Sequence, residues 1–296
     1  MLCRTFPRLT KSVSLTKSGP LTKSVSYDIP RVCALSTTAS DFFKLYVAPG
    51  KPCIVINADQ DWQAKGWTVA EFKKNYSASF FEVGKENNAD PVIKSMGEYL
   101  DYCELIESGS PSTTTPLYLF DSTFDSDAPQ LAMDYAPPPI FPVCVFSTLP
   151  PNLQHLRPEH KWLLVGPERS GSALHVDHLQ TCAWNYLAVG TKTWAIEEEG
   201  SASVLPSRRE GETLWDWFGS VLPSKKFVQR SGEVVFVPAG AGHAVLNNGT
   251  TIAVTHNFLS GGGGSSIDVE GVIRGLEEEV EVSGEERREL GDILST

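Results

Sequence analysis

The sequence has few of the features of a disulfide-stapled or membrane-spanning protein. Its six cysteines are scattered over 296 residues, with no C-x-x-C pair and no repeating interval. This pattern argues against a disulfide framework or a zinc cluster and favours reduced thiols inside a cell. No apolar run approaches the roughly 18 residues that a membrane span needs. We therefore expect a soluble, intracellular protein.

Acidic residues are missing from the first 27 positions, which contain five basic residues. The rest of the chain therefore carries a net charge of −16 within the total of −11. An acidic body is a poor partner for nucleic acids, because each contact with the phosphate backbone needs a cation. We expect it to attract basic protein tails instead, although acidic charge also serves solubility alone.

Composition divides the chain into three parts. Residues 1–26 repeat Leu-Thr-Lys-Ser three times and are poor in core-forming residues, which predicts a disordered leader. A basic, Ser-rich leader is also typical of organelle transit peptides, so an organelle stays open as the compartment. Residues 27–260 have a globular composition. Residues 261–296 begin as a glycine linker and continue as acidic helices, which could cap the domain or form a homodimer with a second copy.

Helices and a few strands are expected before residue 160. The capping-box patterns Thr68-Val-Ala-Glu71 and Ser95-Met-Gly-Glu98 predict helices near 69–76 and 96–107. Apolar spacing and turn residues predict the other elements. These are a helix over 41–47, strands over 53–56 and 117–120, and loops over 109–116 and 122–130.

The following hundred residues contain many short apolar stretches separated by glycine-rich turns. This pattern predicts an antiparallel barrel or sandwich, so the fold is mainly β with flanking helices. A helix over 212–222 is expected between two of the strands. The predicted strands are 161–165, 173–177, 183–189, 193–197, 233–237, 243–246 and 251–258.

Three residues on two of these strands form a candidate metal site. In a strand, residues i and i+2 point to the same face, roughly 6–7 Å apart, so His175 and Asp177 can both point into a barrel. His243, on another strand, supplies a third ligand. Two histidines and one carboxylate occupy one face of an octahedral metal and leave three positions open, which suits non-haem Fe(II) and oxygen chemistry.

The other histidines are interpreted as non-ligating. His178 and His256 each neighbour an inward-pointing residue, so strand alternation turns them away from the metal face. His155 and His160 lie in a loop or at a strand start and are interpreted as surface residues. Large aromatic residues of the same region are interpreted as core filling: Trp184, Trp194 and Phe236.

Two long stretches carry a family resemblance. LLVGPERSGSALHVDHLQTCAWNYLAVGTKTW (163–194) and SGEVVFVPAGAGHAVLNNGTTIAVTHNF (231–258) resemble the metal-binding core of the jumonji-C (JmjC) oxygenases. More narrowly, they are similar to the subgroup described as arginine demethylase and lysyl hydroxylase, once called the phosphatidylserine receptor. The resemblance covers about residues 27–260, with supporting segments at 27–32, 50–62 and 116–124. It implies a double-stranded β-helix, a barrel of the jelly-roll or cupin type.

The resemblance also implies cofactors and their partners. It makes His175, Asp177 and His243 the ligands of Fe(II). It makes Lys192 and Thr255 the partners of the distal carboxylate of 2-oxoglutarate, with O₂ as co-substrate and ascorbate as reductant. A dicarboxylate deep in a barrel needs such a cation and hydroxyl, because an unpaired buried charge is very costly. Nearby contacts are expected from Asn185, Ser172 and Tyr118.

The implied activity is hydroxylation of a protein side chain, either lysyl hydroxylation or demethylation of N-methyl-arginine or N-methyl-lysine. Relatives imply the nucleus or the cytoplasm as the compartment. Two other functions remain open, namely a non-catalytic module that binds protein tails and a cupin-type enzyme of another class. A cupin-type enzyme does not need a lysine–threonine clamp, so binding of 2-oxoglutarate separates it from an oxygenase.

The sequence also departs from its relatives beside the third ligand. Close relatives carry a Trp-Trp pair ahead of the histidine, whereas this chain has Ala241 and Gly242. We expect the smaller pair to widen the cavity mouth or change the approach of the substrate. Milder departures are His178, where proline is usual, and Ser172 in place of threonine.

Overall fold

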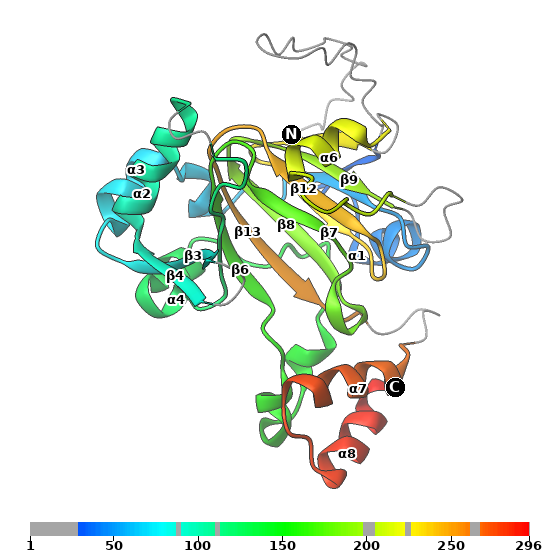
Figure 1. Ribbon diagram of the computed structural model, residues 1–296. Coiled ribbons are helices and arrows are strands. Elements are labelled where there is room, and N and C mark those ends of the chain that lie inside the picture. The colour runs from blue at the N-terminus through cyan, green and yellow to red at the C-terminus, as the bar shows by residue number, and fades with distance from the viewer. Residues whose placement is uncertain are drawn as a thin grey trace.

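The computed structural model describes residues 29–86, 90–109, 113–197, 205–222, 226–260 and 267–295. The predicted leader at 1–26 and the glycine linker at 261–264 lie outside these ranges. Within the described ranges, two sheets face each other as the double-stranded barrel that the sequence predicts, with helices packed around them (Figure 1). None of the helices in these ranges combines the length and the apolar character that a membrane crossing demands.

The larger sheet has seven strands in the order β1-β2-β11-β8-β13-β6-β5, and the smaller has four in the order β10-β9-β12-β7. All neighbouring pairs are antiparallel except β1 and β2. The larger sheet contains β1 (Arg31–Cys33), β2 (Cys53–Ile56), β5 (Leu119–Asp121), β6 (Lys161–Gly166), β8 (Cys182–Val189), β11 (Val234–Val237) and β13 (Thr251–Phe258). The smaller sheet contains β7 (Gly171–His175), β9 (Thr191–Ile196), β10 (Lys226–Arg230) and β12 (His243–Asn247).

Alternation along the strands separates two apolar interiors. On β13, Ile252 and Val254 point to the main core outside the barrel, while Ala253 points into the barrel. The main core is closed by the N-terminal helices, where the ring of Phe42 meets that of Phe236 edge-on at 5.2 Å. The helices on this side are α1 (Ala39–Phe42), the π-helical turn η1 (Phe43–Val47), the 3-10 turn η2 (Gln63–Gly66), α2 (Val69–Tyr76), α3 (Met96–Glu107), α4 (Phe124–Asp127) and α5 (Pro129–Met133).

The capping signals give the helix boundaries that the sequence predicts. Thr68 accepts a hydrogen bond from the Glu71 amide at the start of α2, and Ser95 and Glu98 form a reciprocal capping box on α3. The helix α6 (Leu214–Ser220) confirms the predicted insertion between strands and covers the outer face of the smaller sheet. Such caps satisfy backbone amides that have no partner within the helix.

One local prediction is wrong, and four strands were not predicted. The range 122–130 is not a loop, because α4 and the start of α5 form there; Phe124 and Leu131 are buried and anchor these single-turn helices. The hairpin of β3 (Phe80–Glu86) and β4 (Asp90–Ser95) was not predicted, and neither were β1 and β10. These strands are short or rich in charged residues, so their apolar periodicity is weak.

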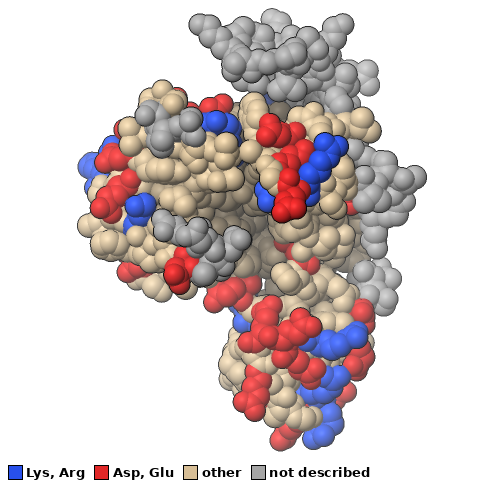
Figure 2. Space-filling view, viewed as in Figure 1, with Lys and Arg blue, Asp and Glu red and all other residues tan. Residues whose placement is uncertain are grey.

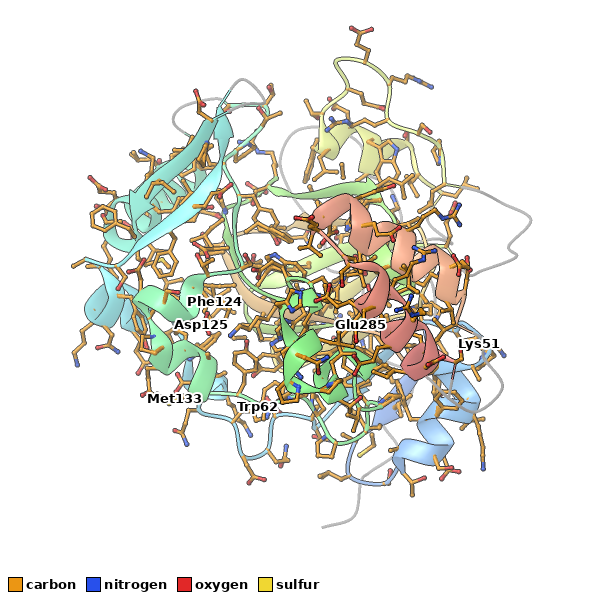
Figure 3. The ribbon with its side chains drawn as sticks, turned by 90° about the horizontal axis from the view of Figure 1, so that it is seen from below. Lys51, Trp62, Phe124, Asp125, Met133 and Glu285 are labelled. Carbon is orange, nitrogen blue, oxygen red and sulfur yellow. The ribbon has the colours of Figure 1, made fainter. Side chains whose placement is uncertain are left out.

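The chain ends in a small helical unit below the barrel (Figures 1 and 3). It joins η3 (Val145–Thr148) and η4 (Pro151–Leu156) to α7 (Val269–Glu279) and α8 (Gly284–Leu294), and is called the C-terminal unit here. These helices bury their apolar faces against one another within this chain. Burial of each leucine or isoleucine side chain stabilises the unit by about 1.5–3 kcal/mol. A homodimer through α7 and α8 stays a prediction. The buried residues are Phe146, Leu149, Leu153, Leu156, Leu259, Val272, Ile273, Leu276, Leu290 and Leu294.

Candidate metal centre

Three side chains meet where β7 lies beside β12. His175 is the last residue of β7 and His243 the first of β12, and the two are direct partners in the antiparallel ladder. The Asp177 Oδ1 atom lies 3.8 Å from His175 Nε2 and 4.0 Å from His243 Nε2. All three ligand atoms lie within 4.8 Å of one another. The structure thus brings the three predicted metal ligands together.

The strand that carries the first two ligands is shorter than predicted. β7 ends at His175, and the 3-10 turn η5 (His178–Gln180) begins directly after Asp177. Asp177 nevertheless keeps extended backbone angles, with φ −64° and ψ 143°. The two-residue spacing therefore still brings both side chains to one place, although only His175 belongs to the sheet.

Backbone carbonyls orient both imidazole rings. Nδ1 of His175 lies 2.7 Å from the Ala173 carbonyl oxygen, and Nδ1 of His243 lies 3.0 Å from that of Ala241. Since a carbonyl oxygen only accepts, each Nδ1 must carry the hydrogen and donate it. The Nε2 atoms of both rings are then the atoms that face Asp177, which is the arrangement of metal-binding histidines. Burial lowers the pKa of His243, which favours this neutral form.

Asp177 has one carboxylate oxygen that no protein group satisfies. Its Oδ2 atom is buried and has no hydrogen-bond partner among the residues that the structure describes. A buried carboxylate oxygen without a donor is costly, and a bound cation removes that cost. Two imidazoles and one carboxylate fit Fe(II), since this donor set leaves three positions of an octahedral ion for other ligands.

The other five predicted residues line the same cavity, which has a volume of about 360 Å³. Its inner end holds Lys192, whose side chain is fully buried and whose Nζ donates a 3.3 Å hydrogen bond to the Tyr118 hydroxyl. Burial lowers the pKa of Lys192 to about 7. The remaining predicted residues are Asn185, Thr255 and Ser172.

Two of these polar groups have distinct hydrogen-bonding states. Asn185 is 3% exposed, and its carbonyl oxygen Oδ1 is buried with no donor in the described part of the chain. The Thr255 hydroxyl donates to the Trp184 carbonyl oxygen at 3.1 Å, so it must rotate before it can donate to a bound carboxylate. Asn247, which the sequence reasoning missed, is fully buried on β12, where its Nδ2 donates to Ser170 Oγ at 2.8 Å and its side chain lowers the pKa of the Tyr118 hydroxyl against the larger effect of burial. Its sequence context of turn residues gave no signal for that role.

The remaining histidines differ in part from their interpretation. His256 points away from the metal ligands as expected, but into the core, where it stacks on Trp184 and hydrogen-bonds Tyr135 at 2.9 Å. His160 is half-buried and lines the cavity, so its interpretation as a surface residue was wrong. His178 also lines the cavity, outside the three-ligand cluster. His155 is exposed and pairs with Glu286 at 3.2 Å.

Two of the three large aromatic residues, Trp184 and Phe236, lie outside the cavity lining, and so does the pair Ala241-Gly242. Trp184 and Phe236 fill the main core as predicted, whereas Trp194 also lines the cavity and lies 6.1 Å from the His243 ring. Neither Ala241 nor Gly242 is among the residues that line the cavity. A Cβ atom at Gly242 would lie 2.8 Å from the Glu197 carboxylate, so this position faces the outer side of the strand.

Known proteins with similar sequences indicate the family of this chain. Residues 219–258, which include His243 and Thr255, match the family model described as "JmjC domain, hydroxylase". The chain carries a JmjC domain. It is 33% identical over 253 residues to a bifunctional arginine demethylase and lysyl-hydroxylase of Caenorhabditis briggsae, a match that covers 78% of this chain and 62% of the relative.

Other JmjC relatives have different names. The chain is 31% identical over 241 residues to a lysine-specific demethylase of Arabidopsis thaliana, covering 74% of this chain and 24% of that protein. It is 27% identical over 250 residues to a 2-oxoglutarate and iron-dependent oxygenase of Danio rerio, covering 75% and 58%. The chain spans about three-fifths of the length of the Caenorhabditis relatives. Two residues of the cavity described above, His243 and Thr255, thus lie in the segment that matches the JmjC model.

Proposed function

We propose that this JmjC chain is an Fe(II)- and 2-oxoglutarate-dependent oxygenase that hydroxylates a protein side chain. One observation carries the proposal: a single cavity holds the cluster of His175, Asp177 and His243 and a fully buried lysine, Lys192. A metal site alone suits many enzymes, and a buried lysine alone suits many anions. Together they match a metal-chelating dicarboxylate in both charge and position.

In this proposal, one end of the cavity binds the metal and the inner end binds the distal carboxylate of 2-oxoglutarate. The three ligands would hold iron, and the Ala173 and Ala241 carbonyls orient the imidazole rings. Iron bound there, with 2-oxoglutarate and O₂, supplies the oxidising power for attack on a C–H bond, and ascorbate keeps it reduced. At the inner end, the Lys192 ammonium pairs with the distal carboxylate, while Tyr118 and Thr255 contribute hydroxyl groups.

The substrate enters from the outer end, where the lining contains Glu159 and Glu279 as well as Arg157. The relatives' names include lysyl hydroxylase, arginine demethylase and lysine-specific demethylase. We therefore propose a lysine or N-methylated arginine or lysine on a basic protein tail as substrate. On a side-chain methylene the product is a stable alcohol, whereas hydroxylation of an N-methyl group ends in loss of formaldehyde.

The test is conversion of 2-oxoglutarate to succinate by the purified full chain with Fe(II) and ascorbate. We expect slow turnover even without substrate, lost in His175→Ala and in Lys192→Ala. His155→Ala is the matched control, since His155 lies outside the cavity, and it should keep full turnover. No turnover by the wild type, together with no binding of 2-oxoglutarate to the iron-loaded protein, would leave the non-catalytic module or another cupin-type enzyme in its place.

A further inference from the structure

A strained turn follows directly after the metal-ligand carboxylate. Leu179 and Gln180 both have left-handed backbone angles, with φ 56° and 54°. Left-handed angles are unfavourable for residues other than glycine, and two in succession need support from their surroundings. Only His178 separates this pair from Asp177. Relaxation of the turn would therefore move the carboxylate that completes the metal site.

The support comes from α7 in the C-terminal unit. The Gln180 side chain donates from Nε2 to the Asp268 carbonyl oxygen at 3.1 Å and accepts from the Asp268 amide through Oε1 at 3.2 Å. Asp268 is the N-cap residue of α7, and its own side chain accepts from the Gly271 amide. One glutamine side chain thus ties the turn to the start of the helix with two hydrogen bonds.

Two glycines allow the helix to approach the turn closely. A Cβ atom at Gly275 would lie 2.4 Å from Leu179 Cδ2; one at Gly271 would lie 2.4 Å from the Asp268 carboxylate and 2.9 Å from Gln180 Nε2. Glycine destabilises a helix interior relative to alanine, so its presence at both contact positions agrees with a requirement for close packing. Leu179 also packs against the apolar cluster of the C-terminal unit.

The same turn borders the active cavity. Leu179 and His178 line it together with Glu279, the last residue of α7. Seen from below, α7 and α8 lie in front of the barrel strands (Figure 3), and Figure 1 has them below the strand ends. A helix distant in sequence from Asp177 therefore packs on the backbone that leads away from this ligand.

We infer that α7 is a positioning element of the metal site and that Gln180 is its positioning residue, holding the turn that orients Asp177. The inference rests on the metal site of the proposed function. It differs from a role in stability alone, because loss of the Gln180 contacts should change the affinity for metal in protein that is still folded.

The experiment measures Mn(II) affinity by calorimetric titration of the full chain, at a temperature where circular dichroism shows every variant folded. Gln180→Ala removes both hydrogen bonds and should weaken Mn(II) binding about tenfold, as loss of supporting contacts around metal ligands commonly does. Gly275→Leu should act in the same direction by displacing Leu179, although leucine favours the helix itself. Adding Leu179→Ala to Gly275→Leu should restore the affinity to within roughly twofold of the wild type.

Leu290→Ala is the matched control, because Leu290 is fully buried in the C-terminal unit and lies on α8, away from the turn. It should lower the melting temperature and leave Mn(II) affinity unchanged. Wild-type affinity in both Gln180→Ala and Gly275→Leu, or equal weakening in Leu290→Ala, would overturn the inference. If the wild type binds Mn(II) and turns over 2-oxoglutarate while the variants are unaffected, only this inference fails. If the wild type binds no Mn(II), the metal site fails with it.

Discussion

At the scale of the residue, Lys192 links the chemistry of the cavity to pH. Burial lowers its pKa to about 7, far below the roughly 10.4 of a lysine in an unfolded chain. Between these two values the unfolded chain binds more protons than the folded one. The empty protein should therefore become more stable as pH rises through this window, because unfolding takes up a proton that Lys192 lacks when folded.

Binding of 2-oxoglutarate should show the opposite dependence. The distal carboxylate pairs with the ammonium form, which declines above pH 7, so the dissociation constant should rise as pH increases from 7 to 8.5, by up to about tenfold per unit. Calorimetric titration of the Mn(II)-loaded protein with 2-oxoglutarate measures this dissociation constant at each pH. Lys192→Met should bind roughly 100-fold more weakly and lose the pH dependence. Lys226→Met, which changes a lysine outside the cavity, should retain the pH dependence. A wild-type dissociation constant that does not change between pH 7 and 8.5 would contradict the prediction.

At the scale of the element, the close pairing of β7 with β12 fixes His175 against His243. Gly171 has φ 150°, and a Cβ atom there would lie 2.0 Å from the Val245 carbonyl oxygen, which belongs to the backbone and cannot swing away. Gly171→Ala should therefore push the strands apart, lower the free energy of unfolding by about 1–3 kcal/mol, and weaken Mn(II) binding. Urea unfolding and metal titration measure the two effects.

Gly249 provides the matched comparison for this pair of strands. It also has a positive φ, of 121°, but a Cβ atom there meets nothing within 4 Å. Gly249→Ala should thus show the cost of backbone strain alone and leave metal affinity intact. Equal losses of metal affinity in both variants would mean that the contact between β7 and β12 does not position the ligands.

Prediction from sequence succeeded for elements whose signals are local. Caps at Thr68 and Ser95 gave two helices with their boundaries, and the spacing of His175 and Asp177 predicted that these two side chains lie close together. It failed where the partner is distant in sequence. Nothing around Lys192 distinguishes it from a surface lysine after a turn, and only the resemblance placed it in the cavity. For His256, strand alternation predicted only that the side chain points away from the metal ligands. It could not predict that Trp184 and Tyr135 bury the side chain there.

At the scale of the whole molecule, the C-terminal unit completes the cavity that the barrel begins. Glu279 on α7 lines the mouth together with Glu159 from the segment before β6. In Figure 2, acidic side chains lie on both sides of the junction between the lower lobe and the barrel. The sequence left open whether the last helices cap the barrel or pair with another copy, because an acidic amphipathic helix is compatible with both. Packing of α7 on the turn after Asp177 supports the cap.

A charge reversal at this mouth tests whether the C-terminal unit contributes to substrate choice. With a basic peptide as substrate, Glu279→Lys should raise KM roughly threefold to tenfold, since it replaces an attraction by a repulsion at a solvent-exposed site. Turnover of 2-oxoglutarate without peptide should not change, because Glu279 lies at the opposite end of the cavity from Lys192. Higher salt should reduce the difference in KM between the variant and the wild type, as expected for exposed charges.

Glu278→Lys makes the same change in net charge on the same helix but outside the cavity lining, and should leave KM near the wild-type value. Equal increases in both variants would assign the effect to the acidic body as a whole, and the local role of Glu279 would be lost.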